Sequence, residues 1–230
     1  MKYILSFLFF ASSVSCISQV RISVSTGIAG FAMNDMARHQ NELREQFPVD
    51  VKVIEAFPLF WYYELAGNTE VTKRLRLGAL VGYTSTGGRM HYNDYSGTIT
   101  CDQLTTTVYV GASGEMLVNA EKWIVSLNWK AGGTFGSYDL DLFLRVDSQS
   151  DSENVKFRST NLFAEPGLTL SKHLFSGLSA TIYAGYNINF IKGKLALKED
   201  RELHLIDNAG DNVNLDWTGF RVAVGLSVLL

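Results

Sequence analysis

Hydrophobic and polar positions alternate along the final segment of the chain, Phe220 to Leu230. Every even-numbered position is apolar, and the odd positions between them are small or polar except for Leu229. A period of two is typical of a β-strand, because successive side chains leave opposite faces of the backbone. The segment therefore predicts a strand with one apolar face and one face of small and polar residues.

The same alternation recurs along the chain and predicts about eight strands. The other seven lie at residues 20–29, 51–65, 75–83, 105–118, 123–135, 156–170 and 178–191. The connections near residues 67–73, 119–122 and 171–177 are short, and those near 30–50, 84–104, 146–155 and 196–213 are long. Short turns at one rim and long loops at the other, with an even number of strands, are typical of membrane barrels.

The first long connection contains a segment of different character, Asn34 to Gln46. Its apolar residues Met36 and Leu43 lie at roughly helical spacing among charged residues, and Pro48 follows. This predicts a short amphipathic helix that either caps the barrel mouth or lies at the membrane surface. The predicted fold class is therefore all-β: a closed antiparallel transmembrane β-barrel of about eight strands, with a short helix in the first long loop.

The N-terminal residues have the composition of an export signal. Lys2 provides the positive region, and an apolar run and a stretch of small residues follow it. The apolar run is too short to span a bilayer. We therefore expect residues 1–18 to be a signal peptide and residues 19–230 to form one barrel domain. Lipidation at Cys16 is the alternative processing of this end.

Charged residues within the predicted strands indicate which face points outward. Those on the face rich in Gly, Ser and Asn come from six different strands: Glu64, Arg76, Glu115, Lys130, Glu165 and Arg221. A Lys or Arg that faced lipid at the bilayer midplane would cost about 2–4 kcal/mol. The opposite, apolar face also carries large aromatic residues near the strand ends, as interfacial girdles do. We therefore predict that the charged face lines the lumen. A soluble, lipocalin-like barrel with the reverse assignment is the alternative.

The interior of an eight-stranded barrel is only wide enough for side chains. Charges buried there must pair, because an unpaired buried charge is strongly penalised. We expect the six charges to form salt bridges that fill the lumen, with Arg221 pairing with Glu115 or Glu165. A narrow polar or gated pore is the alternative arrangement of the same residues.

Motif spacing favours a non-enzymatic protein with no cofactor. The four histidines lack metal-ligand spacing and lie in no nucleophile motif, so the sequence predicts no catalytic residue and no metal site. An enzyme would need a triad such as His91 with Ser85 and Asp94. The formal net charge of -3 gives no nucleic-acid footprint.

One polar segment is rich in Tyr, Ser and Gly, a composition that suits binding loops on a rigid scaffold. Within it, Tyr92, Asp94 and Tyr95 are candidate contact residues, and an ordinary solvated loop is the alternative. Cys101 is the one cysteine beyond residue 18, so no internal disulfide is expected.

The chain from residue 19 onward resembles the small eight-stranded outer-membrane barrels of Gram-negative bacteria, the OmpA/OmpX/OmpW-like family. The alternation from Phe220 to Leu230 and the rhythm of turns and loops carry the resemblance. Leu230 departs from the family, whose chains usually end in an aromatic residue. The resemblance implies an outer-membrane location reached through the periplasm, with outer-membrane lipid and the barrel-assembly machinery as partners.

From the pattern and the resemblance together, we expect a non-enzymatic outer-membrane protein. Its lumen would be filled with side chains, and its extracellular loops would contact a surface ligand. The alternatives are an OmpW-like narrow channel for small molecules and an outer-membrane lipid-modifying enzyme.

Overall fold

The computed structural model describes residues 19–95, 97–120, 123–147 and 149–230. The predicted signal peptide, residues 1–18, and the alternative lipidation site at Cys16 lie outside the described residues.

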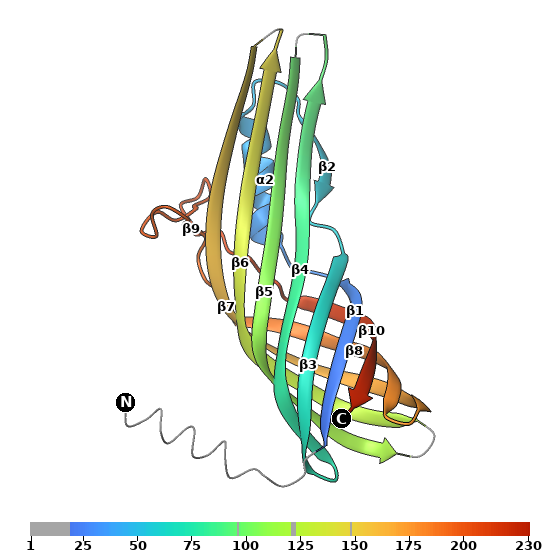
Figure 1. The fold of residues 1–230 in the computed structure, drawn as a ribbon. Coiled ribbons are helices and arrows are strands. Elements are labelled where there is room, and N and C mark those ends of the chain that lie inside the picture. The colour runs from blue at the N-terminus through green and yellow to red at the C-terminus, as the bar shows by residue number, and fades with distance from the viewer. Residues whose placement is uncertain (1–18, 96, 121–122, 148) are drawn as a thin grey trace.

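In the described part of the chain, eight antiparallel strands form a closed ring (Figure 1). These strands are β1 (Val20–Ala29), β3 (Phe60–Thr72), β4 (Leu75–Asn93), β5 (Gly97–Ala120), β6 (Ile124–Val146), β7 (Gln149–Phe175), β8 (Leu178–Ile191) and β10 (Gly219–Leu229). The ring closes because β1 pairs with β3 on one side and with β10 on the other. The predicted closed antiparallel barrel is confirmed.

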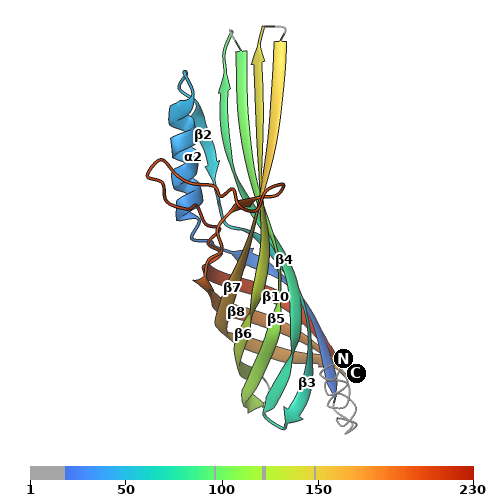
Figure 2. The ribbon, with the colours of Figure 1, turned by 90° about the vertical axis from the view of Figure 1, so that its left-hand side faces the viewer.

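The strands of the ring differ greatly in length. Among the described residues, β4 to β7 have 19, 24, 23 and 27 residues, whereas β1 has 10 and β10 has 11. Because a strand needs only about 9–11 residues to cross a bilayer, the long strands continue well beyond it. They form a protruding sheet above the ring (Figures 1 and 2). We call this sheet the extension; β2 (Lys52–Ala56) pairs with β4 at one edge, and β9 (Ala196–Leu197) pairs with β7 at the other.

Two of the predicted long loops, 84–104 and 146–155, are therefore wrong. Strand pairing continues to Asn93 and resumes at Gly97 in the first, and it continues to Val146 and resumes at Gln149 in the second. Strands outside the bilayer need no lipid-facing apolar side. These segments therefore lack the alternation of apolar and polar residues, and their polar composition predicts a loop. Cross-strand pairs such as Arg89–Asp102 support them instead.

The predicted strand 51–65 is also wrong in its extent, because it is two strands. β2 ends at Ala56 and β3 begins at Phe60. Between them the chain turns at Phe57, whose φ of 47° lies in the left-handed region, and Pro58 follows.

The helix α2 (Asn34–Gln46) has the predicted bounds. It lies against the extension, above the ring (Figure 2). At its C-terminal end, Leu43 and Phe47 pack against buried Val51, Met90 and Cys101. In the part of the chain that the structure describes, the helix is neither long enough nor apolar enough to cross a membrane.

The two faces of the ring have the predicted polarity. On β10, Val222, Val224 and Leu226 are exposed, while Arg221 and Ala223 are buried inside. The predicted girdle aromatics are all exposed on the outer surface: Trp61, Tyr63, Tyr83, Trp123, Trp129, Phe190 and Phe220. A water-soluble barrel would bury this apolar face, so the lipocalin-like alternative is wrong. The outer belt of the ring is suited to contact with lipid.

Candidate functional site: the barrel interior and its mouth

Four of the predicted lumen charges meet in the middle of the ring, and we call them the central ion cluster: Glu64, Lys130, Glu165 and Arg221. Lys130 Nζ lies 2.8 Å from Glu64 Oε1 and 3.2 Å from Glu165 Oε1. Arg221 Nη1 lies 2.9 Å from Glu165 Oε2. Two cations and two carboxylates neutralise one another, so this buried cluster carries no net charge.

Three tyrosines complete the central ion cluster. Tyr109 donates a hydrogen bond to Glu64 (3.1 Å), and Tyr183 donates one to Glu165 (2.7 Å). The Arg221 guanidinium lies over the Tyr109 ring, 4.7 Å from its centroid, and 5.5 Å from that of Tyr62. Lys130 Nζ lies 3.9 Å from the centroid of the Tyr183 ring. Each charge therefore has both an ionic partner and an aromatic or hydroxyl neighbour, which offsets the desolvation that burial imposes.

The other two predicted charges lie near the short-turn end and form the rim ion cluster with a third residue. Arg76 contacts Glu70 (Nη2 to Oε1, 2.7 Å) and Glu115 (Nη1 to Oε2, 3.3 Å). Ser126 donates a hydrogen bond of 2.6 Å to Glu115. The structure thus divides the six predicted charges between two clusters, and it pairs Arg221 with Glu165 rather than Glu115.

A small polar cavity of about 80 Å³ lies between the two clusters. Its lining includes Arg21, Glu64, Glu115 and Lys130, together with Ser and Thr side chains. The Arg21 Nε atom is buried and has no hydrogen-bond partner among the described residues. The cavity has room for a few water molecules, which would satisfy such groups.

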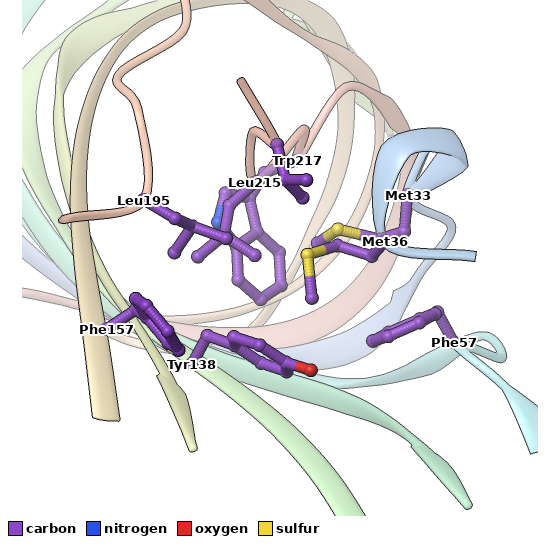
Figure 3. Packing of buried hydrophobic residues seen from close by; sticks show 9 residues of the cluster. Met33, Met36, Phe57, Tyr138, Phe157, Leu195, Leu215 and Trp217 are labelled. Carbon is purple, nitrogen blue, oxygen red and sulfur yellow. The ribbon is translucent and has the colours of Figure 1, made fainter. Parts of the chain in front are cut away.

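Above the central ion cluster, apolar side chains fill the mouth of the ring (Figure 3). This mouth cluster comprises Met33, Met36, Phe57, Tyr138, Phe157, Leu195, Val213, Leu215 and Trp217. Asn161 donates a hydrogen bond of 2.8 Å to the Leu215 carbonyl, which fixes the segment that leads into β10. Met36 belongs to α2, so the helix contributes to this closure, the first of its two predicted positions. The mouth cluster and the central ion cluster thus both lie inside the ring, one above the other.

The predicted contact residues lie at the far end of the extension. Tyr92 donates a hydrogen bond of 2.6 Å to Asp94, and Tyr95 is fully exposed (100%). Cys101 lies on the inner side of the extension, where burial raises the pKa of its thiol to about 11. The thiol is therefore protonated and unreactive at neutral pH.

The candidate triad of His91 with Ser85 and Asp94 is not assembled in the extension. Ser85 and His91 lie on the same strand, six residues apart, which separates them by about 20 Å. His91 instead lies 3.1 Å from the Thr100 hydroxyl. His173 contacts the Ser179 hydroxyl at 2.9 Å near the short-turn end, but no carboxylate bonds to this pair within the described ranges. Those ranges also contain no group of three or more residues able to hold a metal ion.

Sequence analysis missed the partners of the charged residues: Arg21, Tyr62, Glu70, Tyr109 and Tyr183. Tyr62 lies two positions before Glu64, so the strand period alone places both on the inner face. The other four follow from the same alternation within their strands. The alternation places Tyr109 and Tyr183 on the inner face, but the predicted lumen contacts were limited to six charged residues.

A closed ring with an apolar outer belt and an ion-paired, side-chain-filled interior defines the class. The chain folds as a small outer-membrane β-barrel protein. No protein-family model and no curated protein sequence matches it.

Among solved structures, the chain is similar to Ail, the attachment invasion locus protein of Yersinia pestis. Identity is 16%, the match covers 93% of this chain and 99% of that one, and the TM-score is 0.41. It is also similar to a major outer membrane protein from Thermus thermophilus, at 9% identity, with 92% and 99% covered and a TM-score of 0.47. A third is the outer membrane protease OmpT from Escherichia coli, at 10% identity, with 94% and 98% covered and a TM-score of 0.38.

Proposed function

We propose that this protein is a non-enzymatic outer-membrane barrel in which a sealed ring anchors a contact surface, the extension. The observation that carries the proposal is the obstruction of the lumen. The central ion cluster is internally neutral and almost wholly buried, and the mouth cluster lies above it. Such an interior stabilises the ring and leaves no wide path for solutes.

The extension supports the second half of the proposal. It carries exposed apolar and aromatic side chains beyond the lipid belt, including Tyr95, Phe143 and Val146. Exposed aromatic side chains on a rigid scaffold suit a surface that contacts another macromolecule. The strands hold these groups on a rigid sheet rather than on loops.

Conductance across a planar bilayer tests the sealed ring. We expect no steady current from the purified protein, with insertion verified by its heat-shifted mobility on a gel. A steady, ohmic current would support the OmpW-like channel instead. Release of lyso-lipid from membranes that carry the protein would support the lipid-modifying enzyme, and we expect none.

Cysteine labelling on intact bacteria tests the orientation. Tyr95→Cys places a thiol at the end of the extension, and Lys73→Cys places one in the short turn between β3 and β4. A membrane-impermeant maleimide should label the first on intact cells and the second only after the outer membrane is opened. Cys101 is buried and provides the unlabelled background. Labelling of the Lys73→Cys protein on intact cells would contradict the proposed orientation.

A further inference from the structure

A second pocket, of about 880 Å³, lies on the outer surface beside the pairing of β9 with β7. Figure 1 shows β9 next to β7. Five basic residues are among those that line it: Arg158, Lys194, Lys198, Arg201 and His204. No Asp or Glu lines it. The sealed lumen and the contact surface make no use of this pocket.

The four Lys and Arg residues of the pocket are unpaired. Each is exposed, and none forms an ion pair within the described residues. The nearby acids Asp139 and Asp216 are already paired, with Lys156 (3.3 Å) and Lys192 (2.5 Å). The three acids of residues 199–202 flank Lys198 and Arg201 in the sequence but do not line the pocket. Four cations that face a pocket whose lining contains no carboxylate favour an anionic ligand.

The pocket also crosses the edge of the lipid-facing belt. One cross-strand row holds Val108, Phe135 and Thr160, and the next row outward holds Thr106, Ser137 and Arg158. Val108 and Phe135 are exposed apolar residues, whereas the outer row is polar. The boundary between hydrocarbon and headgroup therefore passes through the pocket, and the basic residues lie at and beyond it.

From these observations we infer that the pocket binds one lipid with a phosphorylated headgroup, from the leaflet on the side of the extension. The cations from β7 and the 194–204 segment surround the phosphate, and Val108 and Phe135 contact the first part of an acyl chain. A free phosphate would not need the apolar side of the pocket, so the inference commits to a lipid. The volume of the pocket is within the range of small-ligand sites.

The test measures lipid binding by native mass spectrometry of the full barrel. Phosphatidic acid is the probe, and diacylglycerol with the same chains is its counterpart without phosphate. The variant Arg158→Ser/Lys194→Ser/Arg201→Ser removes three pocket cations. The control Lys52→Ser/Arg74→Ser/Arg145→Ser removes three exposed cations elsewhere, so both variants change the net charge equally.

We expect the unaltered protein to bind one phosphatidic acid and no diacylglycerol at the same concentration. Each Lys or Arg near a charged lipid surface contributes about fivefold, so the pocket variant should bind about 100-fold more weakly. The control should bind as the unaltered protein does. Equal binding by the pocket variant and the control would overturn the inference, as would equal binding of diacylglycerol.

Two further measurements separate a lipid from free phosphate and do not depend on the variants. Millimolar inorganic phosphate should not displace the bound phosphatidic acid, and full displacement would overturn the inference in favour of a simple anion site. In the unaltered protein, phosphatidic acid should protect Lys194 and Lys198 from acetylation and leave Lys52 reactive. Equal acetylation of all three with and without the lipid would also overturn it.

Discussion

The Nη1 atom of Arg221 lies 2.9 Å from Oε2 of Glu165, and the two side chains are 1% and 0% exposed. Glu165 also accepts hydrogen bonds from Tyr183 (2.7 Å) and Asn187 (3.1 Å) and faces Lys130. Glu165 is thus the carboxylate that both buried cations of the central ion cluster contact.

Replacing Arg221 by Met should lower the free energy of unfolding by about 3–5 kcal/mol. The substitution leaves the buried negative charge of Glu165 with Lys130 as its one cation, and Lys130 is already bound by Glu64. Urea titration of the barrel refolded into lipid vesicles measures the loss. Unchanged stability and unchanged heat-resistant folding on a gel would count against the pairing.

The double variant Arg221→Met/Glu165→Leu should recover a large part of that loss. Removing both partners leaves no uncompensated charge, because Glu64 and Lys130 still neutralise each other. The double-mutant cycle gives the coupling energy directly. Two losses that simply add would mean that the residues act independently.

A charge on the lipid belt should be costly, and the same charge on the extension should not. Val224 (59% exposed) lies in the middle of β10, so Val224→Lys should lower the free energy of unfolding in vesicles by about 2–4 kcal/mol. Leu104 is similarly exposed (49%) but lies on β5 beyond the belt. Leu104→Lys should change stability by less than about 0.5 kcal/mol. Equal losses of stability in the two variants would mean that residues 224 and 104 lie in the same environment, which would contradict the lipid belt.

Tyr109 occupies the space over Gly82. A Cβ at residue 82 would lie 2.1 Å from the Tyr109 ring, so Gly82→Ala should displace the tyrosine and cost about 1–3 kcal/mol. Gly67→Ala is the control, because a Cβ there meets nothing within 4 Å. Its free energy of unfolding should stay within about 0.5 kcal/mol of the unaltered protein. A harmless Gly82→Ala would mean that the inner wall tolerates more volume than the packing indicates.

Packing of α2 should weaken in acid. Burial lowers the pKa of His39 below its ordinary value of 6.5, and the Glu42 and Asp207 carboxylates oppose that shift only in part. Arg38, which pairs with Asp207 at 3.0 Å, adds a cation nearby. Below pH 6.5, His39 takes up a proton more readily when the helix is undocked than when it is docked. The stabilisation of the docked helix is therefore present at neutral pH and is lost as the pH falls toward the lowered pKa of His39.

Hydrogen exchange of the α2 amides between pH 7.5 and 5 measures this effect, after correction for intrinsic exchange rates. Protection should fall as the pH is lowered in the unaltered protein. In His39→Leu the group cannot titrate, so the fall should be much smaller. A steeper fall in the variant would contradict the assignment to His39.

The ring was predictable because lipid imposes one rule on every strand that crosses it. Val222, Val224 and Leu226 had to face hydrocarbon, and Arg221 had to face inward, so alternation defined the two faces and the charged residues identified the inner one. The extension escaped prediction because that rule ends at the membrane surface. At Arg89 and Asp102, both sides of the strands meet water or other protein segments. Cross-strand pairs of polar residues are as suitable there as apolar pairs, so no alternation marks the strands.

The charges of the interior were predictable as a set, but their pairing was not. Which carboxylate meets Arg221 depends on the stagger of the strands around the ring, and alternation does not encode stagger. The pocket beside β9 was missed for a related reason. Arg158 and Lys194 are 36 positions apart, and pairing between β7 and β9 brings their segments together.

The pairing of β1 with β10 means that the barrel closes only when both ends of the ring are present. The first ring strand in the sequence pairs with the last one, in a register that runs from Arg21 opposite Leu229 to Ala29 opposite Arg221. Until that final segment arrives, two rows of peptide groups have no partner and cannot enter hydrocarbon. A chain cut short before Gly219 would have no way to seal itself, however sound its remaining hairpins.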